Sequence, residues 1–489
     1  MQSGNENEYA FQKYLTLTLF ALGGIFVLRL MSLWYNNSEL YFDEAQYWFW
    51  SQDPAFGYFS KPPVLAWIIA ITTEICGSDH SFCVRLSAPV IHTATAAMLF
   101  LIAHRLFNAQ VAFWAALLYA TMPAVSLSST IISTDIALLF FWSVALYCYV
   151  RLIEEHDLKW GLALGIALGL AVNAKYAAVY FLGCALLHAW IEQREMTPPR
   201  KRPFWLAMAV AAMMLIPNII WNLHNSFVTV SHTGENIGWS GVNPNWSGLA
   251  EFFGSQFGVF GPILFGMFIA TVIRMMRDSI SFKHRFLLVF SVPIISVILF
   301  QAVISKAYAN WAAVTYIAAT LLVAEILVNR VPHAWLKTST ALHSMMAGAI
   351  AIAVCFAAPG QLVLPNGAQP FARTQGASEI ADIVAKELDL KPYDAVLTFD
   401  RKLSALLAYN LRDRKELKQA WRSNSPRDHF QLVSAFQDNP QETVLLVARY
   451  DQVEGITGKF KQVENLGVRL ISAGETGSIT LYRLSGIIR

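Results

Sequence analysis

Residues Leu40–Trp50 read LYFDEAQYWFW and place two adjacent carboxylates, Asp43 and Glu44, in a strongly aromatic stretch. The stretch follows the first apolar segment of membrane-spanning length, and Lys61-Pro62-Pro63 follows in the same loop. Carboxylates beside a bilayer cost free energy unless they meet cations or take part in chemistry. The structural alternative is an aromatic belt at the membrane surface that includes two acids. We favour a functional site and take Asp43 and Glu44 as candidate catalytic residues.

The composition is that of a membrane protein. Of 489 residues, 55% are hydrophobic and 14% are charged, whereas soluble domains carry about 25% charged residues. The chain is therefore predicted to be a polytopic α-helical membrane protein with a soluble appendage. The net charge of +3, without a concentrated basic run, argues against a nucleic-acid partner.

Apolar runs that cross or nearly cross a hydrocarbon core recur along the chain, about eleven in all. They cover residues 14–34, 84–104, 110–128, 133–151, 160–173, 175–192, 203–221, 254–273, 285–304, 311–329 and 340–358. The first is expected to be retained as a helix, because the N-terminus lacks the features of a signal peptide. The apolar segment 64–76 is too short to span and is predicted to lie at the membrane interface.

Basic residues set the orientation. They recur in five successive turns on one side of the membrane, from His104-Arg105 to Arg330 and Lys337, and this bias marks the cytoplasmic side. The loop 35–83, the loop 222–253, the turn 305–310 and the tail then lie outside the cytoplasm. The site and the C-terminus are therefore predicted to be periplasmic, in a multi-pass protein of the bacterial inner membrane.

The tail changes character after the last apolar run. Strand-length apolar segments begin at Ala395, Thr443 and Ile479, and residues 401–419 have a helical pattern. Alternating strands and helices predict a small α/β domain, entered through a linker that starts at Pro359-Gly360. The predicted domains are residues 1–358, which include the extracytoplasmic loop 35–83 with its interfacial helices, and residues 359–489.

Five cysteines are spread along the chain. Cys148, Cys184 and Cys355 lie in apolar runs and are expected to pack as small apolar side chains. Cys76 and Cys83 share the first extracytoplasmic loop, where an oxidising compartment permits a disulfide. Spacing alone leaves a disulfide and two free thiols equally open.

Two further ionisable residues fall on the predicted periplasmic side. Asp135 opens the fourth span, in Ser133-Thr134-Asp135. Such a residue can be a helix N-cap, but beside Asp43 it is equally a candidate site residue. Lys175 lies between two short spans. A lysine there can extend its amine toward water, but a break between short helices also forms buried sites, which we favour.

Three more candidates lie in extracytoplasmic segments. Lys306 and Tyr308 occupy the turn 305–310, where a membrane-surface lysine with belt aromatics is an equal alternative. Lys61 has the same alternative, weakened by the two prolines that stiffen its surroundings. His224 and His232 could bind a metal, but no supporting cluster favours this over surface polar residues, so no metal site or cofactor is predicted.

Together these residues suggest a chemistry. Lysines and a tyrosine hydroxyl suit a phosphate, and a carboxylate opposite them suits a general base or a group that orients an attacking hydroxyl. The apolar body offers room for a lipid tail. A transferase that uses a phospholipid-linked donor needs this combination.

The chain resembles the GT-C membrane glycosyltransferases, in particular glycosyltransferase family 39. The resemblance covers about residues 14–330 and rests on an ordered set of short motifs. These are Tyr41–Tyr47, Phe59–Pro63, Gly77 with Arg85-Leu86, Thr134-Asp135, Ala174-Lys175, and Lys306 with Asn310-Trp311. It implies the GT-C architecture, inversion at the sugar, and a polyprenyl-phosphate sugar donor in the outer leaflet.

The resemblance also implies residue roles. Asp43 matches the catalytic aspartate of the family, and Asp135 matches its second acidic residue. Lys61, Lys175, Lys306 and Tyr308 look like ligands of the donor phosphate. One departure is Ser60, where the aminoarabinose transferases of the family carry an acid before Lys-Pro-Pro. The resemblance therefore supports neither a metal at that position nor that particular sugar.

The sequence predicts an inverting glycosyltransferase that moves a sugar from a polyprenyl phosphate to a lipid A or lipopolysaccharide acceptor. This follows from a likeness to bacterial envelope transferases that is closer than the likeness to eukaryotic protein mannosyltransferases. The first alternative is a protein O-glycosyltransferase. A second is a transporter or flippase of polyprenyl-linked sugars, since charges in membranes also mark transport paths. A third treats the tail as an independent sensor or binding module.

Overall fold

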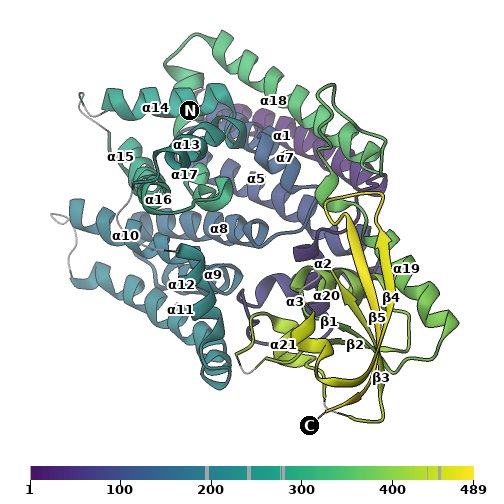
Figure 1. Ribbon diagram of the computed structural model, residues 1–489. Helices are drawn as coiled ribbons and strands as arrows, with labels where there is room; N and C mark the ends of the chain where they lie inside the picture. Colours follow the sequence, from purple (N-terminus) through teal and green to yellow (C-terminus); the bar gives the residue numbers. More distant parts are fainter. Residues whose placement is uncertain are drawn as a thin grey trace. The chain divides into compact units, whose positions relative to one another are not determined.

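The computed structural model (Figure 1) describes residues 2–192, 198–238, 244–275, 277, 281–423, 425–437, 439–449 and 453–488. The chain divides into two compact units. The helical unit consists of residues 1–34, 61–65 and 85–351, and the mixed unit of residues 35–60, 66–84 and 352–489. This division differs from the predicted boundary at residue 358, because most of the loop 35–83 packs with the tail.

The helical unit consists of apolar helices around one large buried core. Its longer helices are α1 (Gln2–Trp34), α5 (Ser87–Leu106), α8 (Thr134–Glu155), α11 (Pro198–His224) and α18 (His333–Ala353). The others are α6 (Ala109–Thr121), α7 (Pro123–Ser128), α9 (Leu158–Ala174), η1 (Tyr176–Ala178), α10 (Val179–Ile191), α12 (Val228–Ile237), α13 (Trp246–Val259), α14 (Pro262–Met275), α15 (Phe282–Val289), α16 (Val292–Ile304), η3 (Ala309–Ala312) and α17 (Thr315–Asn329).

Every predicted apolar run is largely helical, but not all form straight spans. In the described part of the chain, six helical segments are long and apolar enough to cross a membrane, or seven if α13 and α14 form one broken span. The α13–α14 pair bends by 115° at Gly261, whose φ of +95° favours glycine. The run 110–128 divides at Met122, because Pro123 starts a new helix.

Three glycines allow α9 and α11 to pack closely. A Cβ atom on Gly161 would lie 2.3 Å from the Pro203 carbonyl oxygen, and one on Gly165 would lie 2.7 Å from that of Ala207. A Cβ on Gly169 would lie 2.7 Å from the Met214 side chain. Small residues spaced by four let two helix backbones approach in a membrane. The same packing fixes the end of α9, where Lys175 lies.

In the mixed unit, the tail forms a five-stranded sheet of order β2-β1-β3-β5-β4. Strand β1 (Ala395–Thr398) is parallel to β2 (Leu417–Ala420) and β3 (Thr443–Ala448). Strand β5 (Ser478–Ile487) is antiparallel to β3 and to β4 (Phe460–Leu470). Helices α19 (Ala377–Leu390) and α20 (Arg401–Asn410) share one core with the sheet. The sheet's other core includes residues of α22 (Glu454–Thr457).

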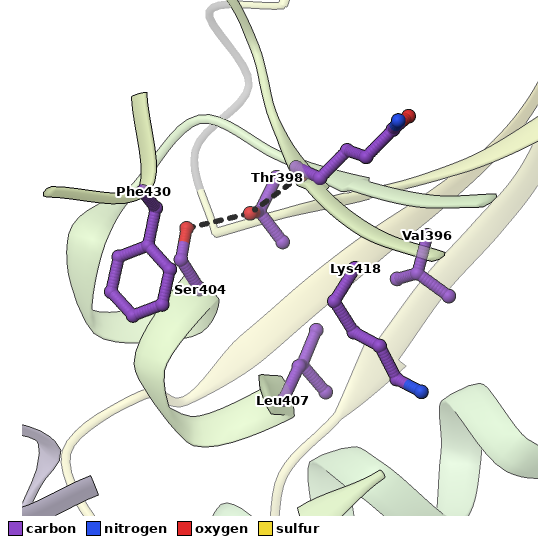
Figure 2. Close-up of a pocket in the computed structure, with 7 residues that line it drawn as sticks. Val396, Thr398, Ser404, Leu407, Lys418 and Phe430 are labelled. Atoms are coloured by element: carbon purple, nitrogen blue, oxygen red, sulfur yellow. Dashed lines mark hydrogen bonds between the residues drawn. The ribbon is translucent and has the colours of Figure 1, made fainter. Parts of the chain in front are cut away.

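The predicted strands that begin at Ala395, Thr443 and Ile479 are present as β1, β3 and β5. The predicted helix 401–419 is too long. It ends at Asn410 and the chain enters β2 at Leu417, because β2 pairs in parallel with β1. A cavity of about 10 Å³ lies beside Thr398, whose hydroxyl is 2.7 Å from that of Ser404 (Figure 2). A single water needs about 10–15 Å³, so this cavity has no room for a sugar or a phosphate.

The segment 35–85 contains α2 (Phe42–Ser51), α3 (Val64–Cys76) and α4 (Ser81–Arg85). These helices belong to the mixed unit, except for residues 64–65 of α3 and Arg85 of α4, which are assigned to the helical unit. The predicted 64–76 helix is therefore present as α3. A disulfide joins Cys76 to Cys83 with a Cα separation of 6.0 Å, which decides the alternative left open by spacing. The Glu39 carboxylate accepts a hydrogen bond from the Ala377 amide (2.6 Å) and so caps the first turn of α19.

Candidate functional site

The two candidate acids lie in the first turn of α2, where the helix dipole favours negative charge. Tyr41 is the N-cap, and the side chain of Glu44 accepts a hydrogen bond from the Tyr41 amide (2.9 Å). Glu44 is 1% exposed, whereas the Asp43 side chain is 34% exposed. Of the two acids, Asp43 is the one that a substrate can reach from solvent, and Glu44 holds the start of the helix.

Asp43 has a cationic partner on α20. The Arg401 guanidinium lies 3.1 Å from Asp43 Oδ1 and donates a hydrogen bond to Gln46 Oε1 (3.3 Å). It also lies over the Phe42 ring, 4.8 Å from the centroid. Burial raises the pKa of the Tyr41 hydroxyl, and the Asp43 carboxylate raises it further, while Arg373 and Arg401 lower it.

Aromatic contacts also hold α2 against the tail. The Trp48 and Tyr409 rings lie edge to face at 5.0 Å, and Phe49 lies 4.6 Å from Phe430, which belongs to α21 (His429–Val433). The Trp48 indole N–H donates to Asp79 Oδ1 (2.7 Å). The helix that carries Asp43 is thus part of the same packed body as the α/β sheet.

In the helical unit, Asp135 and Lys175 form an ion pair. Lys175 Nζ lies 2.7 Å from Asp135 Oδ1, and Asn310 Nδ2 donates to Asp135 Oδ2 at 2.7 Å. The side chains of Lys175 and Asp135 are 17% and 11% exposed. Both carboxylate oxygens of Asp135 therefore have a side-chain donor. Asp135 is well placed to hold Lys175 in position.

The predicted break between two short helices is present. Lys175 follows the last residue of α9 and has an extended backbone (φ −159°, ψ 131°) before η1 begins. Next to it, the Tyr176 hydroxyl donates to Asn218 Oδ1 (2.8 Å), which also ties the break to α11. The interruption turns the Lys175 side chain out of the helix pattern and toward Asp135.

The turn before α17 contributes the remaining predicted residues. Lys306 Nζ lies 4.7 Å from the centre of the Tyr308 ring, a cation–π contact. Tyr308 is 49% exposed, and the same turn supplies Asn310 to Asp135. Lys61 is partly buried and belongs to the same helical unit.

The predicted site residues therefore fall into two groups. The helical unit contains Lys61, Asp135, Lys175, Lys306 and Tyr308, and the mixed unit contains Asp43 and Glu44. Asn310 and Arg401 were not predicted as site residues. The first lies in a motif that the family resemblance quotes, whereas the second is 358 residues from Asp43 and no local pattern marks it. No group of three His, Cys, Asp or Glu side chains suited to a metal is found within the described ranges.

Comparisons with known proteins identify the family and the fold. The chain is 36% identical over 391 residues to the lipid A galacturonosyltransferase RgtD of Rhizobium johnstonii, an alignment that covers 80% of this chain and 81% of the relative. Residues 60–221 match the family described as dolichyl-phosphate-mannose-protein mannosyltransferase.

Solved structures show the fold. ArnT from Cupriavidus metallidurans in the apo state has a TM-score of 0.67 with 14% identity, covering 96% of this chain and 98% of ArnT. The same protein bound to undecaprenyl phosphate gives 0.66. The oligosaccharyltransferase of Archaeoglobus fulgidus gives 0.53 with 12% identity, over 81% of this chain and 64% of that one. With a relative this similar over most of both sequences, the chain belongs to the GT-C membrane glycosyltransferases of the family 39 type.

Proposed function

We propose that this glycosyltransferase moves a sugar from a polyprenyl-phosphate donor to lipid A at the periplasmic face of the inner membrane. The observation that carries the proposal is the 36% identity to a lipid A galacturonosyltransferase over four fifths of both chains. The similarity in fold to an ArnT structure that holds undecaprenyl phosphate supports the donor class. A hexuronic acid is accordingly the first sugar to test.

In the proposed reaction, an acceptor hydroxyl attacks the anomeric carbon from the side opposite the phosphate. A new bond forms between the acceptor oxygen and that carbon, and the bond from carbon to phosphate oxygen breaks. Asp43 takes the hydroxyl proton, or orients the acceptor if it is already ionised. This role fits a partly exposed carboxylate at a helix N-terminus, where Glu44 instead serves as a structural cap.

The helical unit would bind the leaving phosphate. Lys61, Lys175 and Lys306 stabilise the charge that develops on it, and the Tyr308 hydroxyl donates a hydrogen bond. Asp135 acts through Lys175, because the 2.7 Å ion pair fixes where the ammonium lies. Removing one preorganised donor typically costs about 2.7–4 kcal/mol of transition-state stabilisation, so each lysine variant should retain weak activity.

Mass spectrometry of lipid A and core lipopolysaccharide tests the proposal. A null strain would carry the wild-type chain, the Asp43→Asn variant or the Asp53→Asn variant. Asp53 is an exposed acid of the same loop and serves as the matched control. We expect a hexuronic acid mass on lipid A with the wild type and with Asp53→Asn, and its loss with Asp43→Asn. A full lipid A modification by Asp43→Asn would refute the role of Asp43.

A protein acceptor is the second candidate, because residues 60–221 match a family named for protein mannosylation. Glycoproteomics of secreted and periplasmic proteins from the same strains separates the two. Sugar that depends on the wild-type chain and appears on protein, with unchanged lipid A, would favour this candidate.

A further inference from the structure

Arg401 contacts three residues of a single helix turn, and that turn carries the candidate catalytic acid. Its guanidinium meets the Asp43 carboxylate at 3.1 Å, the Gln46 side-chain oxygen at 3.3 Å and the Phe42 ring at 4.8 Å. Residues 42 and 46 are four apart and lie on the same helix face. The planar fork of arginine thus fixes both the position of the carboxylate and the rotation of α2.

Stability alone does not account for this contact. The side chains of Arg401 and Asp43 are 35% and 34% exposed, and ion pairs with that much access to water contribute little to folding. The aromatic contacts of Trp48 and Phe49 already hold α2 on the tail. The main effect of Arg401 is therefore to place a positive charge beside the Asp43 carboxylate, and its contribution to the stability of the α2 packing is small.

We propose that Arg401 of the C-terminal domain is a positioning residue for transfer, which orients the Asp43 carboxylate and keeps it ionised. The inference rests on the proposed function, in which Asp43 receives the acceptor proton. A guanidinium at this distance favours the charged form of a carboxylate. The C-terminal domain would then be part of the catalytic apparatus.

Other charged and titratable groups lie near this pair. The Tyr41 hydroxyl interacts electrostatically with Asp43 and Arg401, and also with Arg373 and Glu475. Burial raises the pKa of the Asp428 carboxyl, while hydrogen bonds from the Gln431 and Phe430 amides and the charge of Arg401 lower it. Among these groups, Arg401 makes its ion-pair contact with the partly exposed Asp43 carboxylate, at 3.1 Å.

The test uses the full chain purified in detergent, with a polyprenyl-phosphate hexuronic acid and lipid A. Arg401→Gln should lower kcat/KM about 10- to 100-fold, as expected for loss of a hydrogen bond to a charged group. The loss should be in kcat, and the acidic limb of the rate–pH profile should move to higher pH. Arg401→Lys, which keeps the charge without the fork, should recover part of the rate.

Arg412→Gln is the matched control. It removes the same charge near the other end of α20, where Arg412 lies over the Tyr409 ring, and it should leave the profile unchanged. Where Asp43→Asn leaves a residual rate, adding Arg401→Gln in that background should cause no further loss. An additive loss in that background, or an acidic limb that does not move, would overturn the inference.

The outcomes distinguish failure of the proposed role of Asp43 from failure of the proposed role of Arg401. If Asp43→Asn is fully active, the proposed role of Asp43 fails and the role of Arg401 fails with it. If Asp43→Asn is inactive while Arg401→Gln has the wild-type rate and pH profile, only the inference about Arg401 is wrong. Thermal unfolding of each variant separates misfolding from a kinetic effect, and Arg401→Lys serves as the folded variant if Arg401→Gln unfolds.

Discussion

At the residue scale, Asp135 and Lys175 form a pair that excludes most water, with 11% and 17% of their side chains exposed. Removing one partner leaves an uncompensated charge, which typically costs about 3–5 kcal/mol, whereas removing both is often nearly neutral. We therefore expect Asp135→Asn and Lys175→Met each to lower the free energy of unfolding by about this amount. The double variant should be close to wild type in stability but keep only the weak transfer activity of Lys175→Met.

Asp157→Asn is the control for this prediction. Asp157 also pairs with a lysine, Lys159, at 2.9 Å, but the two side chains are 44% and 61% exposed. Because both side chains are open to water, its loss should change the free energy of unfolding far less than Asp135→Asn does. Unfolding in detergent, followed by tryptophan fluorescence, measures all four variants. Equal losses for Asp135→Asn and Asp157→Asn would contradict the argument from burial.

The candidate site residues were proposed from local signals in the sequence. Asp135 stands at a helix start and Lys175 at a break between short apolar runs, and both features are visible in the sequence. Their partnership could not be derived, because 40 residues and a whole helix lie between them. Arg401 illustrates the limit, since its contact with Asp43 depends on how the tail packs and not on any nearby pattern.

At the element scale, the packing of α9 on α11 depends on Gly161, Gly165 and Gly169. Their spacing of four is a recognisable membrane packing signal. It was not predicted, because charged residues and apolar runs do not report the spacing of glycines. The lengths of α6 and α20 were also mispredicted. A proline ends the first run early, and pairing with β1 draws the residues after α20 into β2. Apolar content alone does not report either event.

The glycine packing yields a test. Gly165→Ile would place side-chain atoms where the Ala207 carbonyl and Val210 now lie, within 2.7 Å of the new Cβ. Overpacking of this kind typically costs about 1–3 kcal/mol. It should also displace the end of α9 and with it Lys175. The transition-state stabilisation lost in transfer should therefore exceed the loss in the free energy of unfolding.

Gly183→Ile in α10 is the matched control, because no atom lies within 4 Å of a Cβ built there. It should change neither the melting temperature nor the rate of transfer. Melting curves in detergent and the lipid A assay measure both variants. A Gly165→Ile chain with wild-type melting and rate would show that the close approach of the two helices is not required.

At the scale of the whole molecule, the mixed unit is assembled from segments far apart in the sequence. Residues 35–60 and 66–84 join the tail, with Glu39 capping α19 and Tyr409 donating to the Asp79 carbonyl (2.8 Å). The α/β character of the tail could be predicted from its alternating segments. The inclusion of the loop that carries Asp43 could not, because these contacts cross more than 300 residues of sequence.

This assembly predicts acid sensitivity. His429 is 7% exposed and lies edge to face with Trp50 and Tyr58 of the loop. Burial lowers its pKa from 6.5 to about 4. Between these values the unfolded chain binds a proton that the folded chain does not, so the free energy of unfolding falls as pH falls. The total loss on crossing that window should be on the order of 3 kcal/mol.

His429→Phe should remove this dependence, since phenylalanine keeps an apolar ring against Trp50 and does not titrate. His80→Phe, which changes an exposed histidine of the same unit, should leave the slope between pH 6.5 and 4 as in the wild type. Melting curves and the rate of proteolysis within residues 52–57 report the loosening of the loop. If His429→Phe is as acid-sensitive as the wild type, the loop is held by contacts that do not depend on a neutral His429. In that case the acid response must come from other buried groups of the unit.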